Sequence, residues 1–197
     1  MPVKLNEGET LEPLCSNLKI IQSKDCYRFS IDSVLLADFV ETDCTKKLVD
    51  LGTGTGIIPL LLASKEEGLG VVGVELLENL AQMAARSVLC NKVEQRIRII
   101  CRDISGDLSF LGTEQWDIVT ANPPYYPLGT GRISKNSTLA IARHEVKAKL
   151  KDYFAAANLL LKQSGSFYLV HRWARLKELY LLCKSYNLYP AKVQAVA

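Results

Sequence analysis

Along most of the chain, short apolar runs alternate with longer segments that have helical periodicity. The short runs predict buried strands, because they are mainly apolar over the length of one strand. The longer segments predict amphipathic helices, as between Leu77 and Val88, where apolar side chains fall on one helical face. The predicted strands are 47–51, 70–75, 96–101, 116–121, 165–170 and the beginning of a sixth at 191–197, and the predicted helices are 30–41, 55–64, 76–92, 149–163 and 172–186.

The order of these elements is typical of an α/β fold with a mostly parallel, twisted sheet and helices on both faces. The crossovers between its strands should be right-handed. Residues 46–197 form this core in our prediction, and residues 1–45 form an N-terminal extension whose helix is capped by Ser30 or Asp32. Ligands bind such sheets beyond the carboxyl ends of the strands. The ends of the first, second and fourth strands should therefore share one rim.

The composition is ordinary for a soluble globular domain, with 48% hydrophobic and 23% charged residues among 197. No apolar run approaches the ~20 residues of a membrane span, and the first residues lack the apolar core of a signal peptide. The six cysteines are scattered without a C-x-x-C pair, and the chain has two histidines. These features predict a cytoplasmic protein without membrane contact, disulfide framework or metal site.

The stretch "NPPYY", residues 122–126, directly follows the fourth predicted strand. Its two prolines cannot continue a central strand, because each lacks a backbone N–H. A turn explains the prolines. It does not explain an amide side chain and two aromatic rings at the end of a buried strand, so the stretch is a candidate binding site.

A second candidate is the glycine-rich stretch "DLGTGTG", which ends the first predicted strand and contains Asp50 and Gly56. Its glycines do not fit the dinucleotide pattern G-x-G-x-x-G. Glu75 ends the second strand 19 residues after Gly56, where a carboxylate suits the hydroxyls of a ribose. Asp50 would repel a pyrophosphate but could hold an ammonium group. These groups fit S-adenosylmethionine better than NAD.

Asp103, in "CRDIS" after the third strand, is a third acidic residue on the expected rim. Its carboxylate could accept a hydrogen bond from the amino group of the ligand's adenine. A turn or helix cap for the residues that follow is an equally good interpretation.

"VDLGTGTG", "GVE", "CRD" and "NPPYY", in this order, resemble the Rossmann-like class I methyltransferases that use S-adenosylmethionine. "NPPY" resembles the motif of the branch that methylates adenine N6, guanine N2 or glutamine N5. "RFSIDSVLLADF" (28–39) and "ARHE" (142–145) are similar to the bacterial tRNA1(Val) (adenine-N6)-methyltransferase family, which acts on the adenine beside the anticodon. The resemblance implies S-adenosylmethionine as cofactor, held by Arg28, Asp32, Asp50, Gly52, Thr53, Gly54, Gly56, Glu75 and Asp103.

In the catalytic step, the side-chain oxygen of Asn122 and the carbonyl oxygen of Pro123 would accept hydrogen bonds from the two N–H groups of the target amine. Pro124 would rigidify the turn, and the ring of Tyr125 would stack on the base. The resemblance implies RNA, and tRNA in particular, as the partner. The six basic and two acidic residues between 132 and 152 could form a surface for its phosphates, or a solvated loop that leads into a helix. Candidate substrate contacts are Tyr126, Arg132, Lys135, Arg143 and His144.

The resemblance also predicts how the sheet ends. Such methyltransferases have a seventh, antiparallel strand between the fifth and sixth, whereas this chain stops within residues 191–197. We therefore expect a sheet without its last strand and a truncated C-terminus.

Four alternatives remain open at this point. The acceptor could be guanine N2 in RNA, because the same two acceptors suit any planar amine. It could be a protein glutamine, although glutamine methyltransferases of this type carry an N-terminal helical recognition domain, for which the residues before 46 leave little room. A module that binds the cofactor without catalysis is the third alternative, and a nicotinamide dehydrogenase is the weakest.

Overall fold

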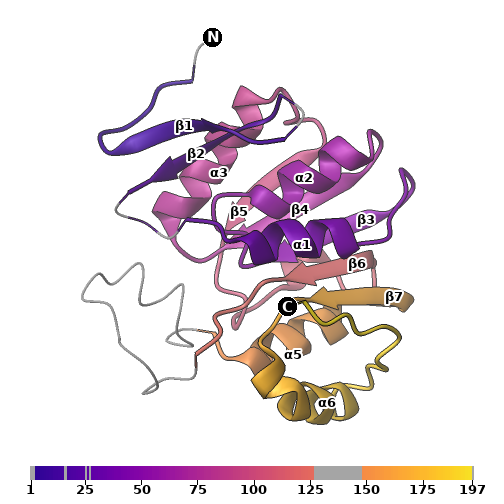
Figure 1. The fold of residues 1–197 in the computed structure, drawn as a ribbon. Coiled ribbons are helices and arrows are strands. Elements are labelled where there is room, and N and C mark those ends of the chain that lie inside the picture. Colours follow the sequence, from indigo (N-terminus) through magenta and orange to yellow (C-terminus); the bar gives the residue numbers. More distant parts are fainter. Residues whose placement is uncertain (1–2, 16, 25, 27, 127–147, 197) are drawn as a thin grey trace.

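The computed structural model describes residues 3–15, 17–24, 26, 28–126 and 148–196. Within these ranges, five strands form one parallel sheet in the order β5-β4-β3-β6-β7 (Figure 1). From β3 the chain runs outward through β4 to β5, and it then returns to place β6 on the other side of β3. The strand order therefore reverses at β3. The strands are β3 (Lys47–Leu51), β4 (Gly70–Glu75), β5 (Ile97–Cys101), β6 (Trp116–Ala121) and β7 (Leu161–Leu169).

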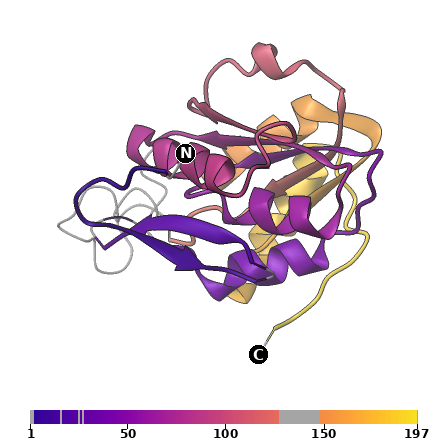
Figure 2. The ribbon, with the colours of Figure 1, turned by 90° about the horizontal axis from the view of Figure 1, so that it is seen from above.

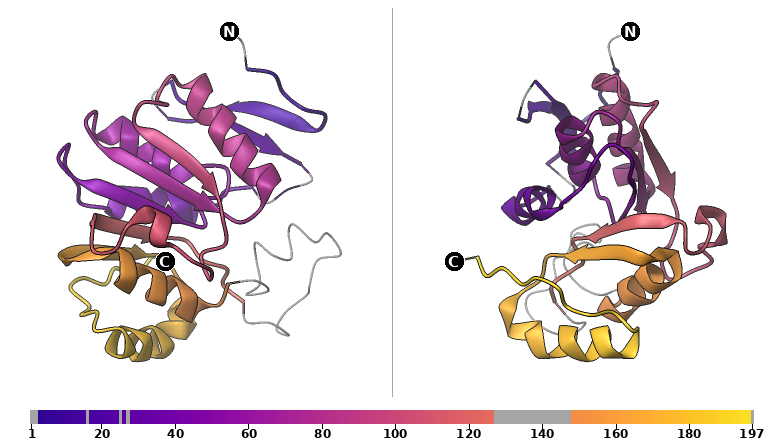
Figure 3. Two further views of the ribbon diagram at one scale, coloured as in Figure 1. Left: turned by 180° about the vertical axis from the view of Figure 1, so that it is seen from behind. Right: turned by 90° about the vertical axis from the view of Figure 1, so that its right-hand side faces the viewer.

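Helices cover both faces of this sheet, which confirms the predicted α/β fold. One face packs against α1 (Ile31–Phe39), α2 (Ile57–Lys65) and α3 (Glu78–Cys90). On the other face α5 (Leu150–Leu160) packs against β6 and β7, and α6 (Leu176–Ser185) packs on α5 (Figure 3). Two 3-10 turns lie at Ser109–Leu111 and Trp173–Arg175.

Strand β3 shows how the two apolar cores are built. Leu48 faces the core beneath α1 and α2, whereas Val49 and Leu51 face the core beneath α5. All three are fully buried, as expected for a central parallel strand. Asp50 lies on the same side of the strand as Leu48, because successive side chains alternate between the faces. A carboxyl group is thus carried into the interior at the rim end of the sheet.

An antiparallel hairpin of β1 (Glu9–Pro13) and β2 (Lys19–Ser23) precedes the sheet and was not predicted. It lies alongside α3 (Figure 2), where the backbone N–H of Ile21 donates to the Ser87 hydroxyl at 2.9 Å. Ile20 and Ile21 are fully buried. Strand β1 is at most half-buried, so its sequence "ETLEP" does not show the apolar run that predicts a buried strand.

Two predictions at the C-terminal end are wrong. Residues 191–196 form no strand, because their side chains are exposed and no neighbouring strand offers backbone hydrogen bonds. Residues 161–163 belong to β7 and not to the preceding helix, since Leu161 is extended and pairs with Trp116. The other predicted elements are present, with ends that differ by a few residues. No helix in the described ranges combines the length and the apolar character needed to cross a membrane.

Candidate active site

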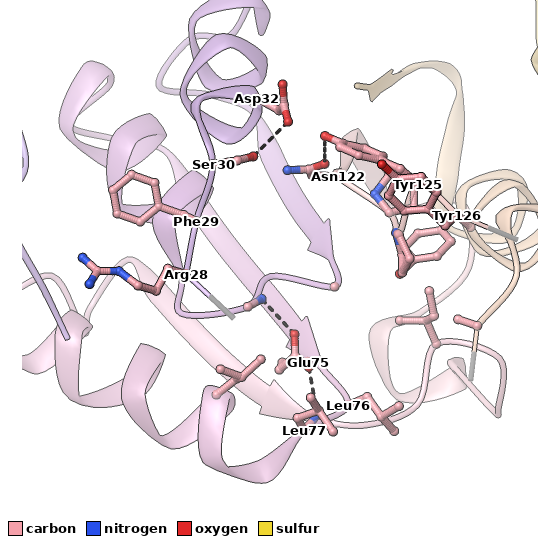
Figure 4. A pocket seen from close by; sticks show the side chains of 18 of the residues that line it. Arg28, Phe29, Ser30, Asp32, Glu75, Leu76, Leu77, Asn122, Tyr125 and Tyr126 are labelled. Carbon is pink, nitrogen blue, oxygen red and sulfur yellow. Dashed lines mark hydrogen bonds between the residues drawn. The ribbon is translucent and has the colours of Figure 1, made fainter. Parts of the chain in front are cut away.

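A cavity of about 500 Å³ lies beyond the carboxyl ends of β3, β4, β5 and β6 (Figure 4). The three rim segments expected from the sequence contribute to it, and so does the segment before α1. The wall includes most of the predicted site residues, namely Arg28, Asp32, Gly52, Gly54, Glu75, Asp103, Asn122, Pro123, Pro124, Tyr125 and Tyr126. Asp50, Thr53 and Gly56 do not line it.

The glycine loop between β3 and α2 has three glycines with positive φ, at +72° for Gly52, +59° for Gly54 and +85° for Gly56. Each position therefore suits glycine, because L side chains rarely adopt this conformation. A Cβ atom on Gly54 would meet nothing within 4 Å, so this residue presents bare backbone to the cavity. A Cβ on Gly56 would lie 3.2 Å from the Cβ of Ala84, so a glycine at this position lets the end of the loop approach α3 closely.

Glu75 ends β4 and is held by two backbone hydrogen bonds (Figure 4). Oε2 accepts from the N–H of Gly54 at 2.8 Å, and Oε1 accepts from the N–H of Leu77 at 2.9 Å. Burial raises the pKa of Glu75 above its ordinary value, while these N–H groups oppose the shift. Each carboxylate oxygen has a second lone pair, so the fixed side chain can still accept hydroxyl groups from a ligand.

Asp50 lies behind the glycine loop and not on the cavity wall, contrary to the contact expected from the sequence. It is fully buried, and its Oδ1 accepts from the Thr120 hydroxyl at 2.7 Å. Burial raises its pKa to about 7, against the effect of the Thr53 and Thr120 hydroxyls, and the charge of Glu75 adds to the rise. Thr53 is also buried at the back of the loop. The pattern of the sequence could not distinguish a residue that lines the loop from one that supports it.

Arg28, in the segment before α1, and Asp32, in the first turn of α1, both line the cavity. Arg28 forms an ion pair with Glu12 of β1 at 2.6 Å, so the hairpin that sequence reasoning missed holds a predicted site residue. The hydroxyl of Ser30 donates to Asp32 at 2.9 Å, and Ser30 makes no side-chain capping bond to the helix. Ser30 is therefore the N-cap residue of α1, as predicted, but its hydroxyl orients the Asp32 carboxylate instead of capping the helix.

Asp103 has the turn-capping role that was one of its two interpretations. Its Oδ1 accepts from the backbone N–H of Ser105 at 2.9 Å and from the Ser105 hydroxyl at 2.7 Å. The same side chain also lines the cavity, beside Ile104. The structural role is thus observed, and contact with a ligand's amino group stays a prediction.

On the opposite wall, the amide of Asn122 is fixed at both ends. Its Nδ2 donates to the hydroxyl of Ser33 on α1 at 2.9 Å, and its Oδ1 accepts from the hydroxyl of Tyr125 at 2.6 Å. The amide is therefore fixed in orientation, and Asn122 lines the cavity next to Tyr125 (Figure 4). Sequence reasoning did not single out Ser33, although it lies in the stretch 28–39 that carries the family resemblance.

Two further residues contact the tyrosines from the end of β7. The ring of His171 meets the ring of Tyr125 edge-on, with centroids 5.4 Å apart, and the guanidinium carbon of Arg172 lies 4.9 Å from the centroid of Tyr126. Burial is the main cause that lowers the pKa of His171 to about 4. Its Nδ1 accepts from the N–H of Arg172 at 2.9 Å, so the neutral ring carries its hydrogen on Nε2. Sequence reasoning did not single out His171 and Arg172. The signal that could have found them is their position just beyond the end of a predicted strand.

Four predicted substrate contacts, Arg132, Lys135, Arg143 and His144, lie outside the described residues and stay predictions. Among the residues that the structure does describe, no group of three or more histidine, cysteine, aspartate or glutamate side chains is arranged to hold a metal ion.

The chain is similar to known methyltransferases in sequence. The family model described as "Methyltransferase small domain" matches residues 27–183. A tRNA1(Val) (adenine(37)-N6)-methyltransferase of Porphyromonas gingivalis is 30% identical over 183 residues, which cover 90% of this chain and 71% of the relative. A protein of the same name from Aeromonas salmonicida is 29% identical over 166 residues, covering 84% of this chain and 68% of the relative.

Solved structures show the same fold. A predicted O-methyltransferase from Agrobacterium tumefaciens has a TM-score of 0.62 at 23% identity, covering 78% of this chain and 67% of the other. A geranyl diphosphate methyltransferase in complex with S-adenosylmethionine has a TM-score of 0.55 at 16% identity, covering 80% and 57%. Together with the family match over most of the chain, these findings show that the chain belongs to the methyltransferase small domain family of S-adenosylmethionine-dependent methyltransferases.

Proposed function

We propose that this enzyme methylates the N6 amine of an adenine in tRNA, beside the anticodon. The observation that carries the proposal is the position of Asn122, whose fixed amide oxygen shares one cavity with the glycine loop. The relatives whose names specify adenine 37 of tRNA1(Val) support both the base and the RNA.

The cavity residues fit S-adenosylmethionine, which supplies, when bound, a methyl group activated by a sulfonium. The open space at Gly54 lets a ligand approach the backbone closely. Glu75 suits the hydroxyls of a ribose, and Asp103 suits the amino group of an adenine. Arg28 and Asp32 offer opposite charges for the amino-acid end of the cofactor. Asp50 supports this wall from behind through Thr120.

Residues 122–126 form the side of the cavity that we call the acceptor wall. This wall would activate the target amine through its geometry. The lone pair of an exocyclic amine is delocalised into the ring, so the nitrogen is a poor nucleophile until its geometry becomes tetrahedral. Asn122 Oδ1 and the Pro123 carbonyl oxygen would each accept a hydrogen bond from one of its two N–H groups, which would aim the lone pair at the methyl group. Asn122 Oδ1 already accepts from Tyr125, and an amide oxygen can accept a second hydrogen bond. Alignment of this kind can supply most of the rate enhancement for a strong methyl donor.

The target base must leave its stack to reach the cavity. Bases in an RNA loop unstack readily and stack on aromatic rings. Tyr125 and Tyr126 both line the cavity, and Tyr126 is 37% exposed as a residue, so the loop offers a surface for such a base. Pro124 limits the conformations of the turn that presents these rings.

The test is methyl transfer from radiolabelled S-adenosylmethionine to unmodified tRNA, to ribosomal RNA and to a release-factor protein. RNA is then digested and its nucleosides are separated. We expect label in N6-methyladenosine from tRNA, reduced at least about 100-fold in Asn122→Ala, while the dissociation constant for the cofactor stays within about threefold. Label in guanosine or in protein would overturn the proposed acceptor. Cofactor binding with no label in any substrate would overturn catalysis.

A further inference from the structure

Arg172 is a cation beside the loop of residues 122–126, and no described carboxylate forms an ion pair with it. Its guanidinium lies over the ring of Tyr126, which lines the cavity. Arg172 lies three residues after the end of β7, and β7 pairs with β6, the strand that Asn122 directly follows. Among the described residues, no hydrogen bond or ion pair of the Arg172 side chain is found, although its backbone N–H donates to His171.

Most other described arginines are used to hold the fold. Arg28, Arg86 and Arg175 each form an ion pair with a glutamate. Arg96 donates to two backbone carbonyl groups. The glutamate nearest to Arg172 on α6 is neutralised by Arg175 and not by Arg172. No described residue therefore neutralises Arg172, and its positive charge is available to bind an anionic ligand.

The stacked geometry determines which group it suits. A guanidinium over an aromatic face is held in orientation by cation–π attraction and keeps its N–H donors free at its edge. Such a fork matches a phosphate oxygen pair, and a phosphate is the anion nearest to any base in RNA. Tyr126 comes directly after Tyr125, so a base stacked on the loop would bring its own backbone close to Arg172.

We infer that Arg172 binds a phosphodiester group adjacent to the methylated nucleotide, with Tyr126 as its stacking platform. This inference rests on the proposed RNA substrate. It adds Arg172 to the residues that we expect to contact the RNA.

The test compares the wild type with Arg172→Gln, Arg172→Lys and Arg98→Gln in methylation of unmodified tRNA at several salt concentrations. Arg98 is a matched control, because it is exposed near the amino end of β5, away from the cavity. Arg172→Gln should raise KM for tRNA about tenfold and reduce the slope of log affinity against log salt by about 1. Arg172→Lys should keep the slope and raise KM about threefold, because it keeps the charge and loses the fork. Cofactor affinity should not change in any variant.

The outcomes separate the two proposals. If the wild type does not methylate tRNA, the proposed function fails and the inference fails with it. If the wild type methylates tRNA, and Arg172→Gln keeps the wild-type KM and salt slope, only the role of Arg172 is overturned. An equal effect of Arg98→Gln would also overturn it, since the contact would then be general attraction to a basic surface.

Discussion

The two walls of the cavity are built in different ways. The cofactor wall consists of the glycine loop and Glu75. It is held mainly by backbone groups, through glycines with positive φ and N–H groups that donate to Glu75. The acceptor wall is held by side chains from distant segments, since Ser33 of α1 and His171 after β7 contact Asn122 and Tyr125.

This difference predicts two kinds of failure. Glu75 on the cofactor wall and Asp50 behind it are both buried, so changes at these carboxyl groups should alter cofactor affinity or stability. Side chains of the acceptor wall orient the reacting amine, so changes there should lower kcat and leave the cofactor affinity alone. The following variants test this contrast, from the largest expected effect to the smallest.

The largest effect is a pH dependence of stability caused by Asp50. Its pKa is raised to about 7 in the folded protein, against an ordinary value of 3.8. Folding therefore favours the protonated form, and the stability that this gives is present at low pH and lost as pH rises from about 4 to about 7. By linkage, the wild type should lose roughly 3 kcal/mol more than Asp50→Asn between pH 5 and pH 8. Chemical denaturation at both pH values measures this difference.

Asp38→Asn controls for loss of a carboxylate, because Asp38 is exposed on α1. An asparagine at position 50 can keep the hydrogen bond from Thr120 and is never charged. Equal losses of stability in the wild type and in Asp50→Asn would contradict the expectation and would show that Asp50 is hydrated in solution.

The second effect concerns Glu75 on the cofactor wall. In Glu75→Gln, one acceptor becomes an NH2 group that faces the N–H of Gly54 or Leu77, and a buried N–H left unpaired costs about 1–3 kcal/mol. We expect cofactor affinity to fall about 100-fold, measured by calorimetry. The control is Glu78→Gln, three residues later and exposed on α3, which should bind normally. Affinity within threefold of wild type would remove Glu75 from the binding wall.

Much of this fold could be predicted because its central strands are buried on both faces. Runs such as "KLVDL" are mainly apolar over one strand length, and the structure has a strand there. The hairpin was missed because β1 is polar and half-exposed, and β2 is buried by its packing on α3. Residues 191–196 were wrongly predicted as a strand, because pairing depends on a neighbour that a local pattern does not reveal.

The candidate site divides along the same lines. Residues within compact motifs, such as Gly54, Glu75 and Asn122, lie on the cavity wall as expected. The burial of Asp50 depends on how the loop folds over it, which no spacing reveals. His171 and Arg172 belong to no motif, and their contacts with the tyrosines follow from the parallel pairing of β6 with β7.

The smallest effect should separate the two walls most clearly. Ser33→Ala removes the acceptor for Asn122 Nδ2, and the amide can then rotate away from the orientation that Tyr125 and Ser33 together impose. A lost buried hydrogen bond is worth about 1 kcal/mol, so kcat should fall roughly five- to tenfold. Steady-state kinetics and cofactor calorimetry on the same preparation measure both quantities.

Cofactor affinity should stay within twofold in Ser33→Ala, because Ser33 does not line the cavity. The matched control is Ser64→Ala, whose exposed hydroxyl donates only within α2 and whose loss should change neither quantity. A parallel fall in kcat and cofactor affinity would mean that α1 moves as a whole and that the walls are coupled. An unchanged kcat would mean that Tyr125 alone orients Asn122, and the acceptor wall would then be smaller than its contacts suggest.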